Sequence, residues 1–104
     1  GLWAQLRLQE AGGGLRAPGD SVTLTCHLSD NTFHGYTIWW YRQAPGGSLE
    51  WVSLISQLGN VKYSAAVKGR ASGSRDSYQS QSSLVLWALL PSDSACYFCA
   101  VHTG

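Results

Sequence analysis

Apolar and polar residues alternate along most of the chain, in short stretches separated by turn-forming residues. In residues 21–26 (SVTLTC) every second residue is apolar, as in a strand with one buried face. In residues 38–43 (IWWYRQ) the even-numbered residues should face one way and the odd-numbered residues the other. Further strands are predicted at residues 49–55, 60–63, 84–86 and 97–101. No segment has a sustained helical period, so the pattern predicts an all-β sandwich.

Composition limits the chain to one domain. With 104 residues, 44% of them hydrophobic, it can bury a modest core and no second one. Its net charge is +1, and its seven basic and six acidic residues are scattered, which argues against binding to nucleic acid or to an anionic membrane. The longest apolar run, residues 84–91, is too short to span a membrane, so any membrane anchor is expected outside this chain.

The three cysteines of this short chain suggest an oxidising compartment, with one disulfide and one thiol left over. No C-x-x-C pair is followed by a second ligand pair at zinc spacing. Two predicted loop histidines, His34 and His102, could share a metal, but such residues more often contact a partner directly. We therefore predict no metal and no cofactor.

Four residues point to a particular family. Cys26 and Cys99 bracket Trp40, and Tyr97 stands two residues before the second cysteine. This spacing resembles that of an immunoglobulin variable domain, in which a disulfide joins two sheets, the tryptophan packs on it and the tyrosine hydroxyl anchors the chain. The resemblance implies a Cys26–Cys99 disulfide, worth roughly 4 kcal/mol of unfolded-state entropy. Cys96 should face the other way, as a partly buried free thiol or, alternatively, in an interchain disulfide.

The resemblance extends over residues 5–101. Residues 40–53 (WYRQAPGGSLEWVS) resemble the second framework of an antibody heavy-chain variable domain, and residues 11–15 and 67–70 are similar to its first and third frameworks. Residues 91–101 (PSDSACYFCAV) instead resemble the matching segment of T-cell receptor alpha and delta chains. This combination is similar to the mu chain of non-placental mammals and to heavy-like delta chains.

The chain also departs from the family pattern. Residues 1–4 are predicted to be a remnant of a leader or tag outside the fold, and residues 5–104 to be the V-type domain. No Phe/Trp-Gly-x-Gly motif of a joining segment follows Cys99, so strand G is expected to be absent. Residues 71–74 (ASGS) are small, which predicts loose packing there. Trp87 is either a core filler or an exposed contact.

The resemblance places the binding surface on three loops at one end of the sandwich, at residues 30–37, at residues 56–62 and from residue 101 onward. Their tyrosine, amide, serine and glycine residues suit antigen contacts, whereas Phe33 is expected to plug the core below the first loop. The predicted antigen-binding residues are Asn31, Thr32, His34, Gly35, Tyr36, Thr37, Ser56, Gln57, Leu58, Gly59, Asn60, Lys62, Val101, His102 and Thr103.

A second surface is expected on one sheet face. In paired receptors an apolar face of this kind docks against a second variable domain. The residues predicted for this pairing face are Tyr41, Gln43, Leu49, Trp51 and Phe98. Tyr41 stands where heavy chains usually carry Val, and its ring could cover Trp51, but tyrosine is also ordinary there in paired T-cell receptor chains. The resemblance to the mu chain implies an unpaired domain at the tip of a longer chain.

The charged residues are predicted to be structural. Arg42, Glu50, Arg70 and Asp93 correspond to a family charge cluster at the base of the sandwich, where Arg70 should pair with Asp93 and a buried Arg42 needs a carboxylate. No serine lies in Gly-x-Ser-x-Gly, and the glycines at residues 12–14 lack the strand and helix of a phosphate-binding loop. We predict that the chain is not an enzyme.

The resemblance therefore implies an extracellular, cell-surface antigen receptor of which this chain is the variable domain. Its expected partners are a protein or other macromolecular antigen and a second variable domain or neighbouring receptor domains. Two alternatives stay open: an antibody heavy-chain or single-domain variable region, and an invariant adhesion or co-receptor domain that binds through a sheet face.

Overall fold

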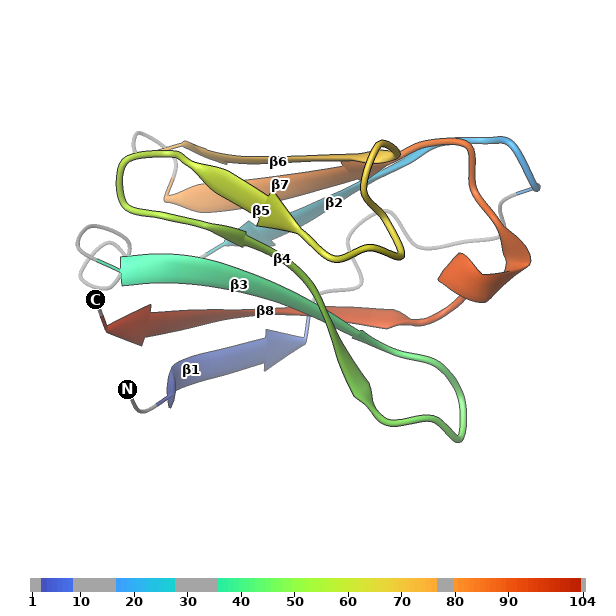
Figure 1. The fold of residues 1–104 in the computed structure, drawn as a ribbon. Coiled ribbons are helices and arrows are strands. Elements are labelled where there is room, and N and C mark those ends of the chain that lie inside the picture. The colour runs from blue at the N-terminus through green and yellow to red at the C-terminus, as the bar shows by residue number, and fades with distance from the viewer. Residues whose placement is uncertain (1–2, 9–16, 28–35, 77–79, 104) are drawn as a thin grey trace.

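The computed structural model describes residues 3–8, 17–27, 36–76 and 80–103, which form two antiparallel sheets packed face to face (Figure 1). One sheet has the strand order β1-β8-β3-β4-β5 and the other β2-β7-β6. In chain order the elements are β1 (Trp3–Leu8), β2 (Val22–His27), β3 (Tyr36–Gln43), β4 (Leu49–Ile55), β5 (Val61–Tyr63), β6 (Ala71–Asp76), β7 (Gln81–Leu86), the short 3-10 helix η1 (Pro91–Asp93) and β8 (Cys96–Thr103). The predicted all-β sandwich is confirmed.

The central strands follow the alternation of the sequence. In β3 the even-numbered residues Ile38, Trp40 and Arg42 are buried, whereas the odd-numbered residues 39–43 are half-buried or exposed. In β8 the odd-numbered residues 97–101 face the core. Inward side chains of both sheets thus form one continuous core between the layers.

A disulfide and a buried polar link join the two sheets. Cys26 of β2 is bonded to Cys99 of β8, as the family resemblance implied. The fully buried Trp40 ring donates its indole N–H to the hydroxyl oxygen of Ser82 at 3.1 Å. Ser82 in turn donates to the carbonyl oxygen of Ser74 at 2.7 Å. The buried serine therefore gives the indole N–H an acceptor in place of the water that it loses on burial.

Simple alternation fails in strand β4. Trp40 pairs with Ser53, but Tyr41 pairs with Trp51, so Val52 is an extra residue in β4. Val52 and Ser53 are consequently both buried although they are neighbours. The bulge turns Trp51 toward the outer face of the sheet, beside Tyr41.

Gly73 of strand β6 lies beside larger side chains of β4 and β5. A methyl group added at Gly73 would lie 3.4 Å from side-chain atoms of both Ile55 and Val61, which is van der Waals contact. The Gly73 N–H also donates to the hydroxyl oxygen of Tyr63 at 2.8 Å. A methyl group would therefore fit here in ordinary contact, and the expectation of loose packing stays a prediction.

Strand β1 is an edge strand that the sequence analysis did not predict. It pairs antiparallel with β8, from Trp3 opposite His102 to Leu8 opposite Phe98. β1 is therefore the edge strand beside β8. Two of the four residues predicted to lie outside the fold are in this strand; their origin in a leader or tag stays a prediction.

Trp87 directly follows β7. Its side chain is 40% exposed and does not fill the core, so of the two alternatives the exposed one holds.

Candidate functional site

The strand register brings three predicted loop segments to one end of the five-stranded sheet. Tyr36, the first residue of β3, pairs with Thr103 near the end of β8, and Ile38 pairs with Ile55, the last residue of β4. Figure 1 shows the β4–β5 turn at this end, next to the start of β3 and the end of β8. We call this region the loop end.

The second predicted loop is the best described part of the loop end. Gln57, Leu58, Gly59, Asn60 and Lys62 are exposed, and Ser56 is half-buried. Leu58 is 90% exposed, more than any other large hydrophobic residue that the structure describes.

The other predicted loop residues fall into three groups. Tyr36 and Thr37 are half-buried in β3, and Tyr36 packs against the core. Val101 is fully buried in β8, which pairs with β3 as far as Thr103, and this corrects its assignment as a loop contact. His102 and Thr103 belong to β8 rather than to a loop. The remaining members lie outside the described residues: Asn31, Thr32, His34 and Gly35, together with the proposed plug Phe33.

Hydrogen bonds within the β4–β5 turn close it tightly. Ser56 N–H donates to the Asn60 carbonyl oxygen at 2.8 Å, and Gly59 N–H donates to the Ser56 carbonyl oxygen at 2.9 Å. The Ser56 hydroxyl oxygen also accepts the Asn60 N–H at 3.0 Å. Gly59 has a φ of +91°, which a residue with a side chain rarely adopts. The turn therefore has one preferred shape, with Leu58 at its tip.

Arg75 of β6 connects this turn to the start of β3. One of its guanidinium nitrogens donates to the carbonyl oxygens of Ser56 at 2.7 Å and Tyr36 at 2.9 Å, with a longer bond of 3.4 Å to Ile55. Burial lowers the pKa of Arg75. A cation from the opposite sheet thus fixes the bases of two predicted loops, a contact that the sequence analysis missed.

The base of the sandwich, at the opposite end, holds the predicted charge cluster. Arg42 donates to Asp93 at 2.9 Å and to Glu50 at 2.8 Å, and Arg70 donates to both carboxylate oxygens of Asp93 at 2.8 and 3.1 Å. The Tyr97 hydroxyl donates to the Asp93 carbonyl oxygen at 2.7 Å, which is the anchoring role expected of this tyrosine. The predicted pairs of the cluster are confirmed.

Asp93 is the centre of this cluster, and only 6% of its surface is exposed. Burial alone would raise the pKa of its carboxyl group. Hydrogen bonds from Arg70, from the Leu90 N–H and from Arg42 outweigh that effect and lower the pKa to about 2. The carboxylate is therefore charged at neutral pH, and all its contacts are structural.

The outer face of β3, β4 and β8 carries the residues predicted for the pairing face. Tyr41 pairs with both Trp51 and Phe98, and Gln43 pairs with Leu49, so all five lie together. Trp39, which the prediction did not include, stacks on Tyr41 at 6.2 Å between ring centroids and lies tilted against Trp51 at 6.4 Å. The three rings cover one another in part, while Leu49 is 45% exposed.

A model of one protein family, the immunoglobulin V-set domain, matches residues 15–104. The match spans most of the chain and agrees with the two sheets and the disulfide. The chain belongs to the immunoglobulin V-set family. V-set domains are not enzymes, which confirms that prediction, and disulfide-bonded domains of this kind are typical of extracellular and cell-surface proteins.

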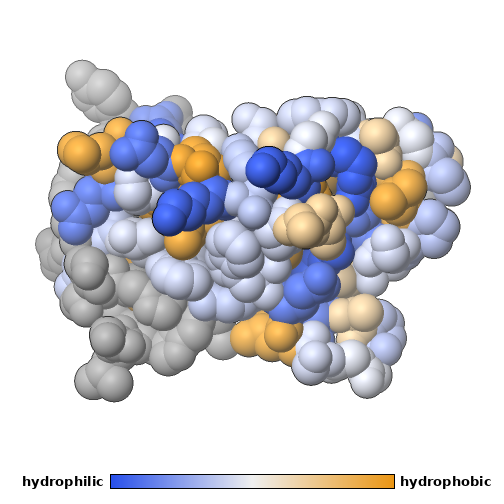
Figure 2. Space-filling view, in the orientation of Figure 1, coloured by the Kyte–Doolittle hydropathy of each residue, from blue (hydrophilic) through white to orange (hydrophobic). Residues whose placement is uncertain are grey.

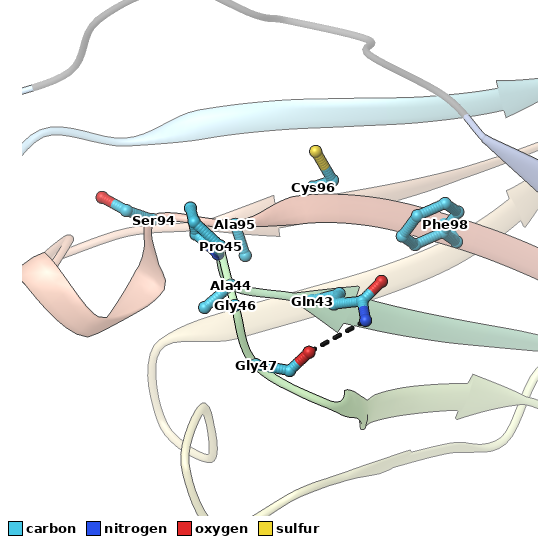
Figure 3. Close-up of a pocket in the computed structure, with 9 residues that line it drawn as sticks. All are labelled: Gln43, Ala44, Pro45, Gly46, Gly47, Ser94, Ala95, Cys96 and Phe98. Atoms are coloured by element: carbon cyan, nitrogen blue, oxygen red, sulfur yellow. Dashed lines mark hydrogen bonds between the residues drawn. The ribbon is translucent and has the colours of Figure 1, made fainter.

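In this V-set domain Cys96, the cysteine outside the disulfide, is free and exposed at the start of β8. It lines a hollow beside the turn between β3 and β4, together with Gln43, Phe98 and residues 44–47 and 94–95. Figure 3 shows the Cys96 sulfur pointing away from the turn, whereas the Gln43 amide donates to the Gly47 carbonyl oxygen at 2.9 Å. Cys96 is exposed, so the expectation of a partly buried thiol is wrong.

Two kinds of feature are absent from the described part of the V-set domain. No group of three or more His, Cys, Asp or Glu residues within it is placed to hold a metal ion. None of its helices has the length and apolar character needed to cross a membrane.

Proposed function

We propose that this V-set domain is the variable domain of a clonally diversified antigen-receptor chain, similar to a T-cell receptor mu chain or a heavy-like delta chain. It binds a protein or another macromolecular antigen through the loop end, outside the cell and as part of a longer receptor chain. The observation that carries the proposal is the second loop, where exposed Gln57, Leu58 and Asn60 stand on a turn held by its own hydrogen bonds and by Arg75. Exposed side chains on a rigid support are what a recognition loop requires.

The framework residues support the receptor class. Residues 40–53 resemble an antibody heavy chain, whereas residues 91–101 resemble T-cell receptor chains. An antibody heavy-chain or single-domain variable region would bind in the same way and differ in the domains attached to it.

The outer sheet face supports an unpaired domain. Trp39 packs on both Tyr41 and Trp51, so these rings shield part of one another's apolar surface without a second domain. Light scattering at high micromolar concentration should therefore give a monomer. An obligate dimer through this face, or co-purification with a second variable domain, would contradict the unpaired state.

The exposure of Leu49 on this face favours a second candidate function, an invariant adhesion or co-receptor domain that binds through the sheet. Sequencing several transcripts of this chain from the tissue that expresses it separates the two functions. An antigen receptor should show diversity concentrated after Ala100, with residues 40–53 constant. A single invariant sequence in all transcripts would refute the receptor proposal and favour adhesion.

A further inference from the structure

Leu58 stands apart from the other exposed hydrophobic residues of the described chain. It is 90% exposed, whereas Leu49, Leu90 and Trp87 are 45%, 49% and 40% exposed. Most of its side chain therefore contributes nothing to the core. In Figure 2 the end of the molecule with the β4–β5 turn shows apolar atoms among polar ones.

The turn presents Leu58 in a fixed position. Ser56 and Asn60 on either side are joined by hydrogen bonds of 2.8 and 3.0 Å, and Gly59 bonds back to Ser56 at 2.9 Å. Arg75 holds the carbonyl oxygen of Ser56 at 2.7 Å from below. A preformed turn loses little backbone conformational freedom on binding, so more of the burial of Leu58 appears as affinity.

We propose that Leu58 is the specificity-determining anchor of the second loop and that it enters an apolar pocket on a protein partner. The proposal rests on antigen recognition through the loop end and adds the chemistry of the partner. Exposed polar residues, Gln57, Asn60 and Lys62, lie close to the leucine in the sequence. An apolar anchor that is buried on binding within a rim of polar contacts is the usual arrangement of an energetic hot spot.

The shape and charge of the turn select a protein as the partner. Small ligands bind in concave pockets that enclose them, and the tip of a turn is convex. Membrane-binding surfaces combine several apolar residues with a cluster of Lys or Arg, whereas here one leucine is accompanied by one lysine, Lys62. A protein surface with a pocket of leucine size, bordered by hydrogen-bonding groups, is complementary to this arrangement.

A binding experiment on an array of purified extracellular and cell-surface proteins tests the proposal. The chain is displayed as a multimer in four forms: unchanged, Leu58→Ser, Leu58→Met and Leu90→Ser. Leu90 is the matched control, because it is an exposed leucine at the opposite end of the sandwich. Array proteins that bind the unchanged chain should lose about tenfold or more in affinity with Leu58→Ser. They should retain most of it with Leu58→Met and all of it with Leu90→Ser.

The outcomes separate this inference from the proposed function. Binding that survives Leu58→Ser overturns the anchor and leaves antigen recognition by other loop residues standing. If no array protein binds the unchanged chain, both proposals fail. Binding to phosphatidylcholine or phosphatidylserine vesicles that depends on Leu58 overturns the choice of a protein partner.

Amide hydrogen exchange of the free chain tests the fixed presentation without any partner. The amides of Gly59 and Asn60 should exchange slowly, because they donate to the carbonyl and hydroxyl oxygens of Ser56. Ser56→Ala should speed up exchange at Asn60 and weaken array binding along with it. Unprotected exchange at both amides in the unchanged chain would overturn the preformed turn.

Discussion

The two ends of the sandwich use arginine in opposite ways. At the base, Arg42 and Arg70 both donate to the buried carboxylate of Asp93. At the loop end, Arg75 donates to the backbone carbonyl oxygens of Tyr36, Ile55 and Ser56. Whether the pKa of each arginine is raised or lowered depends on these partners. Burial lowers the pKa of Arg75, whereas for Arg42 hydrogen bonds to Glu50, Tyr97 and Asp93 outweigh burial and raise the pKa.

This difference separates stability from positioning. A charge buried against a carboxylate fixes the fold, because removal of either partner leaves the other charge uncompensated. A guanidinium bonded to carbonyl oxygens instead fixes the backbone that passes over it, whatever side chains that backbone carries. The loop residues can then vary while their support stays the same, which suits the proposed recognition function.

The largest expected effect is at the base. Asp93→Asn removes the carboxylate shared by Arg42 and Arg70, so the free energy of unfolding should fall by about 3–5 kcal/mol. Urea denaturation measures the change. Glu50→Gln is the matched control, because the Glu50 side chain is 50% exposed and its pair with Arg42 should be worth less than about 1 kcal/mol. Equal losses in both variants would show that the buried carboxylate is not the centre of the cluster.

Acid should reproduce part of this loss. The Asp93 pKa is about 2 in the folded chain against an ordinary value of 3.8, so the unfolded chain binds the proton first as the pH falls. The stabilisation is complete above pH 3.8 and is lost as the pH falls through 2, a loss of about 2 kcal/mol. Urea midpoints between pH 5 and pH 2 measure it. Asp93→Asn should lack this component, and an unchanged pH dependence in that variant would assign it to other groups.

An intermediate effect is expected at the loop end. Arg75→Met removes three hydrogen bonds to carbonyl oxygens, which should lower the free energy of unfolding by about 1–2 kcal/mol. Amide exchange should become faster in residues 56–60, while the base, reported by the Trp87 N–H bonded to the Arg70 carbonyl oxygen, stays protected. Arg75→Lys keeps the charge, so its free energy of unfolding should lie between those of the unchanged chain and Arg75→Met. Uniform loss of protection at both ends would mean that Arg75 acts on the whole fold.

The sequence was more informative about the base than about the loop end. Arg42 stands at an inward position of a strand and needs a carboxylate partner, and the family resemblance implied the pair of Arg70 with Asp93. The contacts of Arg75 could not be predicted, because its partners are carbonyl oxygens that every residue carries. The pattern of side chains along the sequence therefore does not indicate which carbonyl oxygens it binds.

Other features escaped prediction for similar physical reasons. The extra residue Val52 shifts the alternation of β4 by one position, and only the register with β3 shows where. The pairing of β1 with β8 joins strands from the two ends of the chain, which local periodicity does not encode. The one local signal was Ser82, a polar residue at an inward position that could have suggested a hydrogen bond to the core tryptophan.

The smallest effect is expected at Cys96, which tests whether the base is stabilised by its interior alone. Cys96 precedes Tyr97 in β8, and alternation places the tyrosine in the buried cluster and the thiol on the surface. Cys96→Ser should therefore change the free energy of unfolding by less than about 0.5 kcal/mol. The native thiol should react readily with a maleimide, and non-reducing mass analysis should show Cys26 bonded to Cys99. A loss comparable to that of Asp93→Asn, a thiol that reacts only after unfolding, or a Cys96–Cys99 bond would contradict the division between a closed interior and an open surface at this end.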